Sequence, residues 1–316
     1  MQKQMERAGH KDERSRESGL CDRSIELHRI LACKPLTSTW LHVNATVRDP
    51  YDRKKTEHLL ALDGANERLH LFKAELLEEG SFDSAVEGCI GVFHTFLLVI
   101  LAPRIRSSII KRVIITSSLA AVMLTGKPLA DDVVADETWF SDPVVCEKLK
   151  DWYMLSKTLA ERAAWKFSEE KVMDMVTINP DTVLGPLLLP TLNTSVEPIA
   201  KLVGAETFRN ATCRLADVRD VANAHIFAFE NPLACGRYCV AGKPTHSCEI
   251  FKMLRELYPH LNLPQKYSDE NLSMPAFPAF QVSQERVKSL GIKFTSLEVS
   301  LKDTVDSLMA KNLLSV

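Results

Sequence analysis

The chain has 316 residues, of which 46% are hydrophobic and 25% are charged, and its formal net charge at pH 7 is −2. A chain of this length can bury a large core, and it fits one α/β unit with a smaller lobe. The near-zero charge, with no aromatic residues interleaved among basic clusters, argues against a nucleic-acid-binding surface.

Eight cysteines are scattered along the chain without C-x-x-C pairs. This pattern predicts reduced thiols, mostly in the core, and argues against a disulfide framework or a zinc site. Cys235 and Cys239 are close in sequence and are interpreted as structural. The charged N-terminus is not typical of a secretory signal, and the apolar run 92–103 is too short to span a bilayer. We therefore expect a cytoplasmic, soluble protein that is monomeric and has no membrane partner.

The N-terminal part of the chain, residues 1–42, differs from the rest. It is dense in charged residues, has no strand-turn-helix pattern, and is predicted to be disordered or loosely helical. No glycine occurs between Gly19 and Gly64, so this part contains no glycine-rich turn.

Alternating and apolar runs then predict a series of strands and helices. Strands are expected at 43–48, 69–74 and 90–94, and a helix with Ser81 as its N-cap is expected to begin near residue 81. After Thr95 the next strand begins at Lys111. A parallel crossover needs a dozen or more residues, so residues 96–110 allow only a minimal one.

Two stretches in the middle of the chain contain candidate catalytic residues. Residues 111–118 combine a β-branched run with the hydroxyls of Thr116, Ser117 and Ser118, a pattern typical of a buried parallel strand. The hydroxyls would lie at the carboxyl edge of the sheet, where open α/β sheets bind ligands. Residues 152–169 predict a helix on which Tyr153 and Lys157, four residues apart, share one face. The apolar face of this helix is expected to comprise Leu155, Leu159, Ala163 and Phe167.

This constellation has a chemical meaning. A carbonyl group that accepts a hydride also needs a proton for its oxygen, and a phenol can supply it. An unperturbed tyrosine has a pKa near 10, and a cation one helical turn away lowers that pKa by stabilising the phenolate. A serine hydroxyl facing the same point can hold the carbonyl oxygen. The alternative is that Tyr153 and Lys157 are a chance helix pair, which is common.

The C-terminal half continues the alternation of strands and helices. A strand at 172–179 is ended by Pro180, and further elements are expected at the ranges 218–230 (helix), 237–240 (strand), 248–258 (helix) and 298–311 (helix). His225 is interpreted as a core or sheet-edge histidine and not as a catalytic base. Side chains that could wall an aromatic pocket, or equally form ordinary core, are Phe277, Phe280 and Leu187 to Leu189.

Several stretches together resemble the plant group of extended short-chain dehydrogenases/reductases that includes dihydroflavonol reductases and cinnamoyl-CoA reductases. The matching stretches are 45–50, 91–95, 116–118, 153–161, 178–186 and 217–225. The run 190–195 is most similar to the branch of phenylacetaldehyde reductases and cinnamyl-alcohol-dehydrogenase-like reductases. The resemblance begins near Val43 and continues to the C-terminus.

The resemblance implies a Rossmann-like α/β fold, a doubly wound parallel sheet with a smaller C-terminal substrate lobe. The cofactor domain is expected at 43–185 and 215–245 and the substrate lobe at 186–214 and 246–316. Relatives carry a glycine-rich turn after their first strand, which places the pyrophosphate at a helix N-terminus. Because this chain lacks that turn, its first βα unit is predicted to be lost or replaced.

The resemblance also implies an NADPH-dependent reductase of aromatic aldehydes, such as phenylacetaldehyde or cinnamaldehyde, or of related carbonyl compounds of plant phenylpropanoid metabolism. Ser118, Tyr153 and Lys157 take the catalytic positions. Residues 96–110 depart from the family, since bulky residues replace those expected to line the cofactor. The competing hypothesis is therefore a catalytically impaired relic, or the product of a mis-spliced gene model. The family's CoA-handling residues are not evident, which disfavours a thioester substrate.

Cofactor contacts follow from the same resemblance. An arginine after the second family strand suits a 2′-phosphate and hence NADPH, although Arg48 and Lys55 can equally be read as solvated charges. Glu75 is one methylene longer than the aspartate of relatives. The positions implied for the cofactor are Arg48, Lys55, Glu75, Leu76, Thr95, Tyr153, Lys157, Pro180, Thr182, Val183 and Ser195. No metal site is expected.

Overall fold

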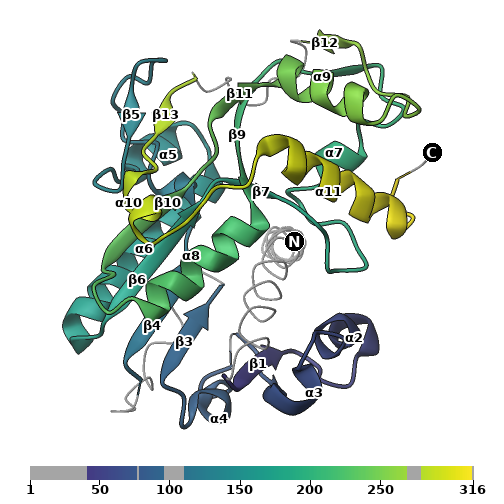
Figure 1. Cartoon of the computed structure of the whole chain (residues 1–316). Coiled ribbons are helices and arrows are strands. Elements are labelled where there is room, and N and C mark those ends of the chain that lie inside the picture. Colours follow the sequence, from purple (N-terminus) through teal and green to yellow (C-terminus); the bar gives the residue numbers. More distant parts are fainter. Residues whose placement is uncertain (1–40, 77, 96–109, 269–278, 315–316) are drawn as a thin grey trace, which may run out of the picture.

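The structure, a computed structural model, describes residues 41–76, 78–95, 110–268 and 279–314 (Figure 1). The predictions for residues 1–40, for the interval after Thr95 up to residue 109 and for Phe277 lie outside this part of the chain. The described part is built of parallel strands covered by helices, which confirms the predicted α/β class.

A four-stranded parallel sheet forms the centre of the molecule, with the strand order β10-β6-β4-β3. Its strands are β3 (Gly91–His94), β4 (Arg112–Thr116), β6 (Met175–Pro180) and β10 (Gly236–Val240). Every residue of the two inner strands, β4 and β6, is buried. This is the pattern expected of parallel strands that are covered on both faces.

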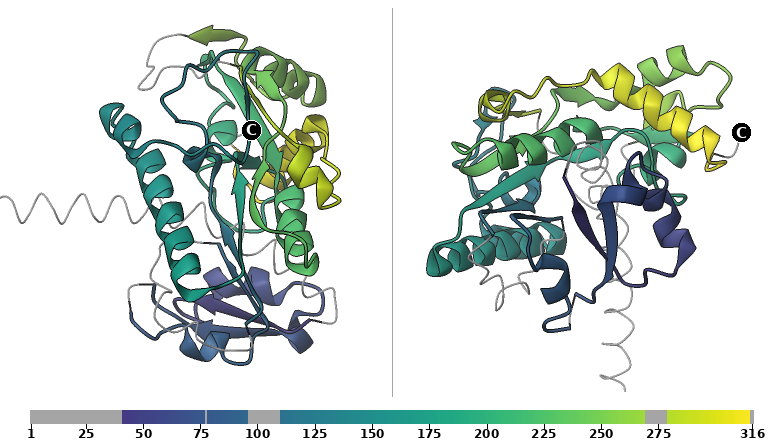
Figure 2. Two further views of the ribbon diagram at one scale, coloured as in Figure 1. Left: turned by 90° about the vertical axis from the view of Figure 1, so that its left-hand side faces the viewer. Right: turned by 60° about the horizontal axis from the view of Figure 1, so that its bottom comes forward.

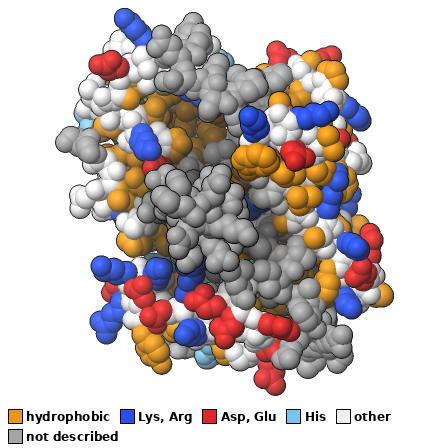
Figure 3. Space-filling view, turned by 180° about the vertical axis from the view of Figure 1, so that it is seen from behind, with side chains coloured by type: hydrophobic (Ala, Val, Ile, Leu, Met, Phe, Trp, Pro, Cys, Tyr) orange, Lys and Arg blue, Asp and Glu red, His pale blue; other side chains and the backbone are white. Residues whose placement is uncertain are grey.

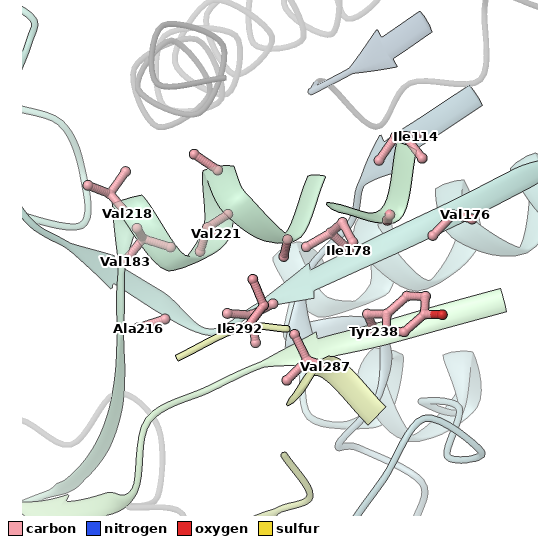
Figure 4. Packing of buried hydrophobic residues seen from close by; sticks show 14 of the residues in the cluster. Ile114, Val176, Ile178, Val183, Ala216, Val218, Val221, Tyr238, Val287 and Ile292 are labelled. Carbon is pink, nitrogen blue, oxygen red and sulfur yellow. The ribbon is translucent and has the colours of Figure 1, made fainter. Parts of the chain in front are cut away.

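Two long helices cover opposite faces of this sheet, α6 (Trp152–Lys171) and α8 (Val218–Glu230), as the left view of Figure 2 shows. Alternate residues of β4 point to opposite faces. Val113 and Ile115 pack with Ala164 of α6, whereas Ile114 packs on the other side with Val176, Ile178 and residues of α8. Figure 4 shows Ile114, Ile178 and Val221 within this second cluster.

The N-terminal unit forms a separate two-stranded sheet. Its elements are β1 (Val43–Val47), α2 (Arg53–Leu60), α3 (Ala65–Arg68) and β2 (Leu69–Lys73), followed by α4 (Asp83–Val86). The strands β1 and β2 pair in parallel, and all five residues of β1 are only partly buried. Asn44 Nδ2 donates to Ala85 O of α4 over 2.9 Å. Leu59 and Leu69 of this unit pack with Leu189, in the segment after β7.

The upper part of the molecule in Figure 1 is formed by the C-terminal elements and shorter strands. The strands β7 (Thr182–Leu184), β9 (Thr212–Asp217) and β11 (Pro244–His246) form a three-stranded sheet, and two parallel pairs join β12 (Lys266–Ser268) to β8 (Thr207–Arg209) and β13 (Gln281–Val282) to β5 (Val134–Ala135). The remaining helical elements are η1 (Leu119–Ala121), α5 (Pro143–Lys148), α7 (Glu197–Ala200), α9 (Ser247–Leu257), α10 (Glu285–Ser289) and α11 (Leu297–Ala310).

The strands and helices predicted from residue 43 onward are present, and α8 has the predicted bounds. Two local predictions are wrong. Ser81 does not cap α4, whose N-cap is Phe82; the Ser81 hydroxyl instead donates to Glu75 O over 2.6 Å. The predicted apolar face of α6 is not the buried one, since the buried residues are Met154, Thr158, Glu161, Ala164 and Ser168.

The described cysteines are less buried than the sequence analysis predicts, since two are buried (Cys146 and Cys239), three are partly buried (Cys89, Cys213 and Cys248) and Cys235 is exposed. Cys89, Cys146, Cys213, Cys235, Cys239 and Cys248 are free thiols. Within the described ranges no set of His, Cys, Asp and Glu side chains is grouped to hold a metal ion, and none of the helices is both long and apolar enough to cross a bilayer. On the rear face, Lys and Arg side chains are interspersed with Asp and Glu side chains (Figure 3).

Candidate active site

Three adjacent strands bring the central candidates to one edge of the sheet. Because β3, β4 and β6 are parallel neighbours, their carboxyl ends meet there. Thr95 follows β3, Ser118 follows β4, and Pro180 ends β6. The backbone N–H of Ser117 donates to Ile178 O over 2.8 Å, so that pairing continues beyond the last residue of β4.

The two serines after β4 lie in different environments. Ser117 is buried, and its hydroxyl donates to Glu161 Oε2. Ser118 is partly exposed and caps η1, its Oγ accepting a hydrogen bond from the Ala120 N–H over 3.2 Å. The hydroxyl hydrogen of Ser118 can therefore point away from η1 toward a ligand, whereas the Ser117 hydroxyl is committed to a carboxylate. The geometry favours Ser118 over Ser117 as the substrate-facing serine.

Tyr153 and Lys157 occupy the first two turns of α6, the helix against which η1 packs. Asp151 begins the helix by accepting a hydrogen bond from the Met154 N–H over 3.0 Å, a usual N-cap arrangement. Tyr153 is 56% exposed. The Lys157 ammonium lies 5.8 Å from the centroid of the Tyr153 ring, within the range of a cation–π contact.

Behind this edge lies a buried polar network that sequence reasoning missed. Glu161, two turns after Tyr153 on α6, is 1% exposed and forms an ion pair with Arg237 of β10, with 2.6 Å between Oε1 and Nε. Asn179 Nδ2 donates to Glu161 Oε2 over 2.8 Å and to Ser118 O over 3.1 Å. The i, i+4, i+8 spacing of Tyr153, Lys157 and Glu161 was the available sequence signal.

The candidates for the adenosine end of a cofactor all lie in the N-terminal unit. Arg48 follows β1, and Lys55 lies in the first turn of α2; both side chains are exposed. Glu75 and Leu76 follow β2 and are partly buried, and the Glu75 N–H donates to Ser81 Oγ over 3.2 Å. Arg48, Glu75 and Leu76 follow the paired strands β1 and β2, and within the described ranges that sheet shares no strand with the one carrying Ser118.

The candidates for the nicotinamide end, Pro180, Thr182 and Val183, lie in β6 and β7, and Ser195, the candidate for a cofactor phosphate, follows β7. Pro180 and Val183 are buried, Val183 within the core shared with α8, and Ser195 donates its N–H to Asn193 Oδ1 over 3.0 Å. The Thr182 N–H donates to Asp181 Oδ1 over 2.7 Å, so that donor is already used. The carboxylate of Asp181 also pairs with Arg214, with 3.1 Å between Oδ2 and Nε.

Two buried polar atoms, Thr95 Oγ1 after β3 and Asn193 Nδ2 in the segment after β7, test whether the chain fits a cofactor. Thr95 Oγ1 and Asn193 Nδ2 lie on side chains that are 4% and 1% exposed, and neither has a hydrogen-bond partner within the described part of the chain. Orphaned buried polar atoms are rare in folded proteins and call for a partner. Their chemistry fits a polar ligand such as the nicotinamide-ribose end of a dinucleotide.

Other side chains considered from the sequence belong to the core. His225 is 1% exposed; its Nδ1–H donates to Val221 O over 2.7 Å, and Nε2 lies 2.6 Å from Thr116 Oγ1. Burial lowers the pKa of His225 to about 4, which confirms the core interpretation. Phe280 is fully buried with Arg214 over its ring, and Leu187 and Leu189 are buried in two other clusters. The core alternative therefore holds for these residues.

Known plant reductases are similar to this chain in sequence and in structure. No family model matches the chain. The chain is 53% identical over 291 residues to cinnamoyl-CoA reductase CAD2 of Medicago truncatula, a match that covers 85% of this chain and 88% of the relative. It is 40% identical over 288 residues to cinnamoyl-CoA reductase 1 of Arabidopsis thaliana, covering 85% and 82% of the two chains. Among solved structures, vestitone reductase from alfalfa (Medicago sativa) has a TM-score of 0.76 at 30% identity, covering 90% of this chain and 95% of that one.

Proposed function

Because this chain belongs to the plant dihydroflavonol reductase and cinnamoyl-CoA reductase group of extended short-chain dehydrogenases/reductases, we propose that it reduces an aromatic aldehyde or a related carbonyl compound to the alcohol. Its class is that of NADP-dependent oxidoreductases. The reaction consumes one aldehyde, one NADPH and one proton, and it yields one alcohol and one NADP⁺.

The observation that carries the proposal is the placement of Ser118 against the helix of Tyr153 and Lys157. Ser118 is the partly exposed serine at the carboxyl edge, and η1, which it caps, packs on α6. NADPH, when bound, supplies the hydride for the carbonyl carbon. Ser118 would orient the carbonyl oxygen, Tyr153 would give that oxygen its proton, and Lys157 would favour the phenolate that results.

Different kinds of residue are available to bind the nicotinamide end and the adenosine end of the cofactor. At the nicotinamide end, Thr95 and Asn193 offer buried polar atoms, with Pro180, Thr182 and Val183 in β6 and β7. Ser195, after β7, would contact a cofactor phosphate. At the adenosine end, the cationic Arg48 and Lys55 suit a 2′-phosphate, while Glu75 and Leu76 lie after β2. The sequence holds no glycine between Gly19 and Gly64, so the usual backbone cradle for the pyrophosphate has no counterpart there.

A second candidate substrate is a cinnamoyl-CoA thioester, which the names of the relatives at 53% and 40% identity favour. Reduction would then consume one thioester, one NADPH and one proton and yield the aldehyde, free CoA and NADP⁺. The same three side chains would act, because a thioester also presents a carbonyl oxygen that gains charge as hydride arrives. The difference would lie in the substrate pocket.

One assay separates these possibilities. Purified protein is given NADPH and, in turn, phenylacetaldehyde, cinnamaldehyde and cinnamoyl-CoA, and the loss of NADPH absorbance is followed. We expect the highest kcat/KM with an aldehyde. Highest turnover with cinnamoyl-CoA would select the thioester. If no substrate is turned over and a calorimetric titration detects no NADPH binding, the chain is the catalytically impaired relative, and the proposal fails.

A further inference from the structure

The carboxylate of Glu161 is an unusual feature of helix α6 because it is buried yet completely bonded. Its Oε1 accepts from Arg237 Nε over 2.6 Å and from Trp165 Nε1 over 3.2 Å. Its Oε2 accepts from the Ser117 hydroxyl and from Asn179 Nδ2. A carboxylate with donors on both oxygens cannot be replaced by an amide without turning an NH₂ group against at least one donor.

Arg237, the ion-pair partner of this carboxylate, donates hydrogen bonds to backbone carbonyls of the loops beside the candidate site. Its Nη1 donates to Glu137 O over 3.1 Å and to Trp139 O, and its Nη2 donates to Ala121 O over 3.1 Å. The guanidinium also lies 4.0 Å from the centroid of the Phe140 ring. The Glu161–Arg237 pair therefore connects α6 to the end of η1 and to the loop before α5.

A direct path leads from Glu161 to the catalytic candidate Ser118. Asn179 is fully buried, and its Nδ2 group donates both to Glu161 Oε2 and to the carbonyl oxygen of Ser118. The Oδ1 atom of Asn179 accepts from the Thr177 hydroxyl over 3.0 Å, which fixes the orientation of the amide. The Ser118 carbonyl also accepts from the Ala121 N–H over 3.0 Å, so the anchored peptide is the one that begins η1.

We propose that Glu161 is a positioning residue of the reductase site: acting through Asn179, its buried carboxylate holds the Ser118 peptide in a fixed place relative to Tyr153 and Lys157, which share its helix. The proposal rests on the proposed function in so far as it concerns turnover. Ser118 and the two helix residues come from different elements, and a misplacement of about 1 Å between reacting groups can cost about a hundredfold in rate. Glu161 touches no substrate in this account.

A second ion pair of the same sheet provides a matched control. Arg112 of β4 is buried and pairs with Asp174, with 2.8 Å between Nε and Oδ2, at the amino end of β4 and β6. Like Arg237, it also donates to backbone carbonyls, those of Ala228, Asn231 and Pro232. The Asp174 side chain is 45% exposed, so this control is matched in its arginine and not in the burial of its carboxylate. Asp174→Asn perturbs this partly exposed pair at the edge of the sheet that lies away from Ser118.

The test compares Glu161→Gln, Asn179→Ala and Asp174→Asn with the parent chain. Asn179→Ala leaves the Glu161–Arg237 pair intact, so it tests the path even if Glu161→Gln does not fold. Hydrogen–deuterium exchange of the peptide 117–124 reports the η1 turn without any ligand. We expect exchange in this peptide to be about tenfold faster in the first two variants and unchanged in Asp174→Asn.

Kinetics provide the second readout, measured well below the melting temperature of each variant. For Glu161→Gln and Asn179→Ala we expect kcat to fall about tenfold or more, with KM and the NADPH dissociation constant within about twofold of the parent values. Unchanged exchange in peptide 117–124 would overturn the proposal, and so would faster exchange with an unchanged kcat. If the parent chain turns over no substrate, the proposed function fails, and the exchange comparison alone decides whether Glu161 holds Ser118.

Discussion

Strands β1 and β4 are both five-residue parallel strands, yet they are buried to different extents. All five residues of β4 are buried, because β3 and β6 flank it and helices α6 and α8 cover the sheet. All five residues of β1 are partly exposed, and β2 is its one hydrogen-bonded neighbour within the described ranges. A sequence that favours the β conformation therefore does not by itself bury a strand. The burial of the strand depends on the strands and helices that pack beside it.

The same contrast separates the two ends of the proposed site. The residues that would carry out the chemistry, Ser118, Tyr153 and Lys157, follow β4 of the four-stranded central sheet or lie on α6, which covers it. The residues that would bind the adenosine end, among them Arg48 and Lys55, belong to the N-terminal unit. We infer that the catalytic side chains are held in place more firmly than the residues that would bind the adenosine end. Cofactor affinity should therefore be the weaker property of this site.

The largest expected effect is the loss in free energy of unfolding when the ion pair of the central sheet is broken, compared with the loss when that of the N-terminal unit is broken. Arg237→Met leaves Glu161 buried without its cation, and breaking such a pair typically costs about 3–5 kcal/mol. Arg68 and Glu67 form the corresponding pair of the N-terminal unit, 3.4 Å apart, with side chains 24% and 79% exposed. Exposed pairs contribute at most about 1 kcal/mol, so Glu67→Gln, at the 79% exposed partner, should change the free energy of unfolding by less than that. Denaturant unfolding of both variants measures the difference, and equal losses would contradict the contrast.

The next effect is the pH dependence of the free energy of unfolding that arises from His225, a residue of α8 that contacts β4. Burial holds the pKa of His225 at about 4, below its value of 6.5 in an unfolded chain. The unfolded chain therefore binds more protons between these values, and the free energy of unfolding should fall by roughly 3 kcal/mol as pH drops from 6.5 to 4. His225→Gln, which can still bond Thr116 and Val221, should flatten this dependence. Denaturant midpoints across the window measure it, and an unchanged slope in the variant would rule His225 out as the source.

The smallest effect compares one valine from each region. Val176 in β6 is fully buried, and Val176→Ala should lower the free energy of unfolding by about 2 kcal/mol through lost burial and a cavity. Val47 in β1 is partly exposed, so Val47→Ala should cost less than about 1 kcal/mol. Both variants are read by the same denaturant titration. A larger loss for Val47→Ala would show that β1 is better packed than its exposure indicates.

The centre of the sheet could be predicted because β4 and β6 are rich in β-branched residues, and α8 because its apolar residues recur at helical spacing. The apolar face of α6 was predicted wrongly because its buried face includes Thr158, Glu161 and Ser168, whose polar groups are satisfied by partners such as Arg237 and Met154. Glu161 and Arg237 are 76 residues apart, and no local pattern links them. Ser118 was favoured over Ser117 by resemblance, and the bond from Ser117 to Glu161 supplies a physical reason for that choice.

The central claim is that Tyr153 gives the proton in a carbonyl reduction at the carboxyl edge of the four-stranded central sheet. Its most direct test is the turnover of Tyr153→Phe with NADPH and the best aldehyde, with Tyr51→Phe, a change at a 91% exposed tyrosine of the N-terminal unit, as the control. We predict that Tyr153→Phe loses about 10²–10⁴-fold in kcat while its melting temperature stays that of the parent, and that Tyr51→Phe keeps full activity. Full activity in Tyr153→Phe would contradict the account.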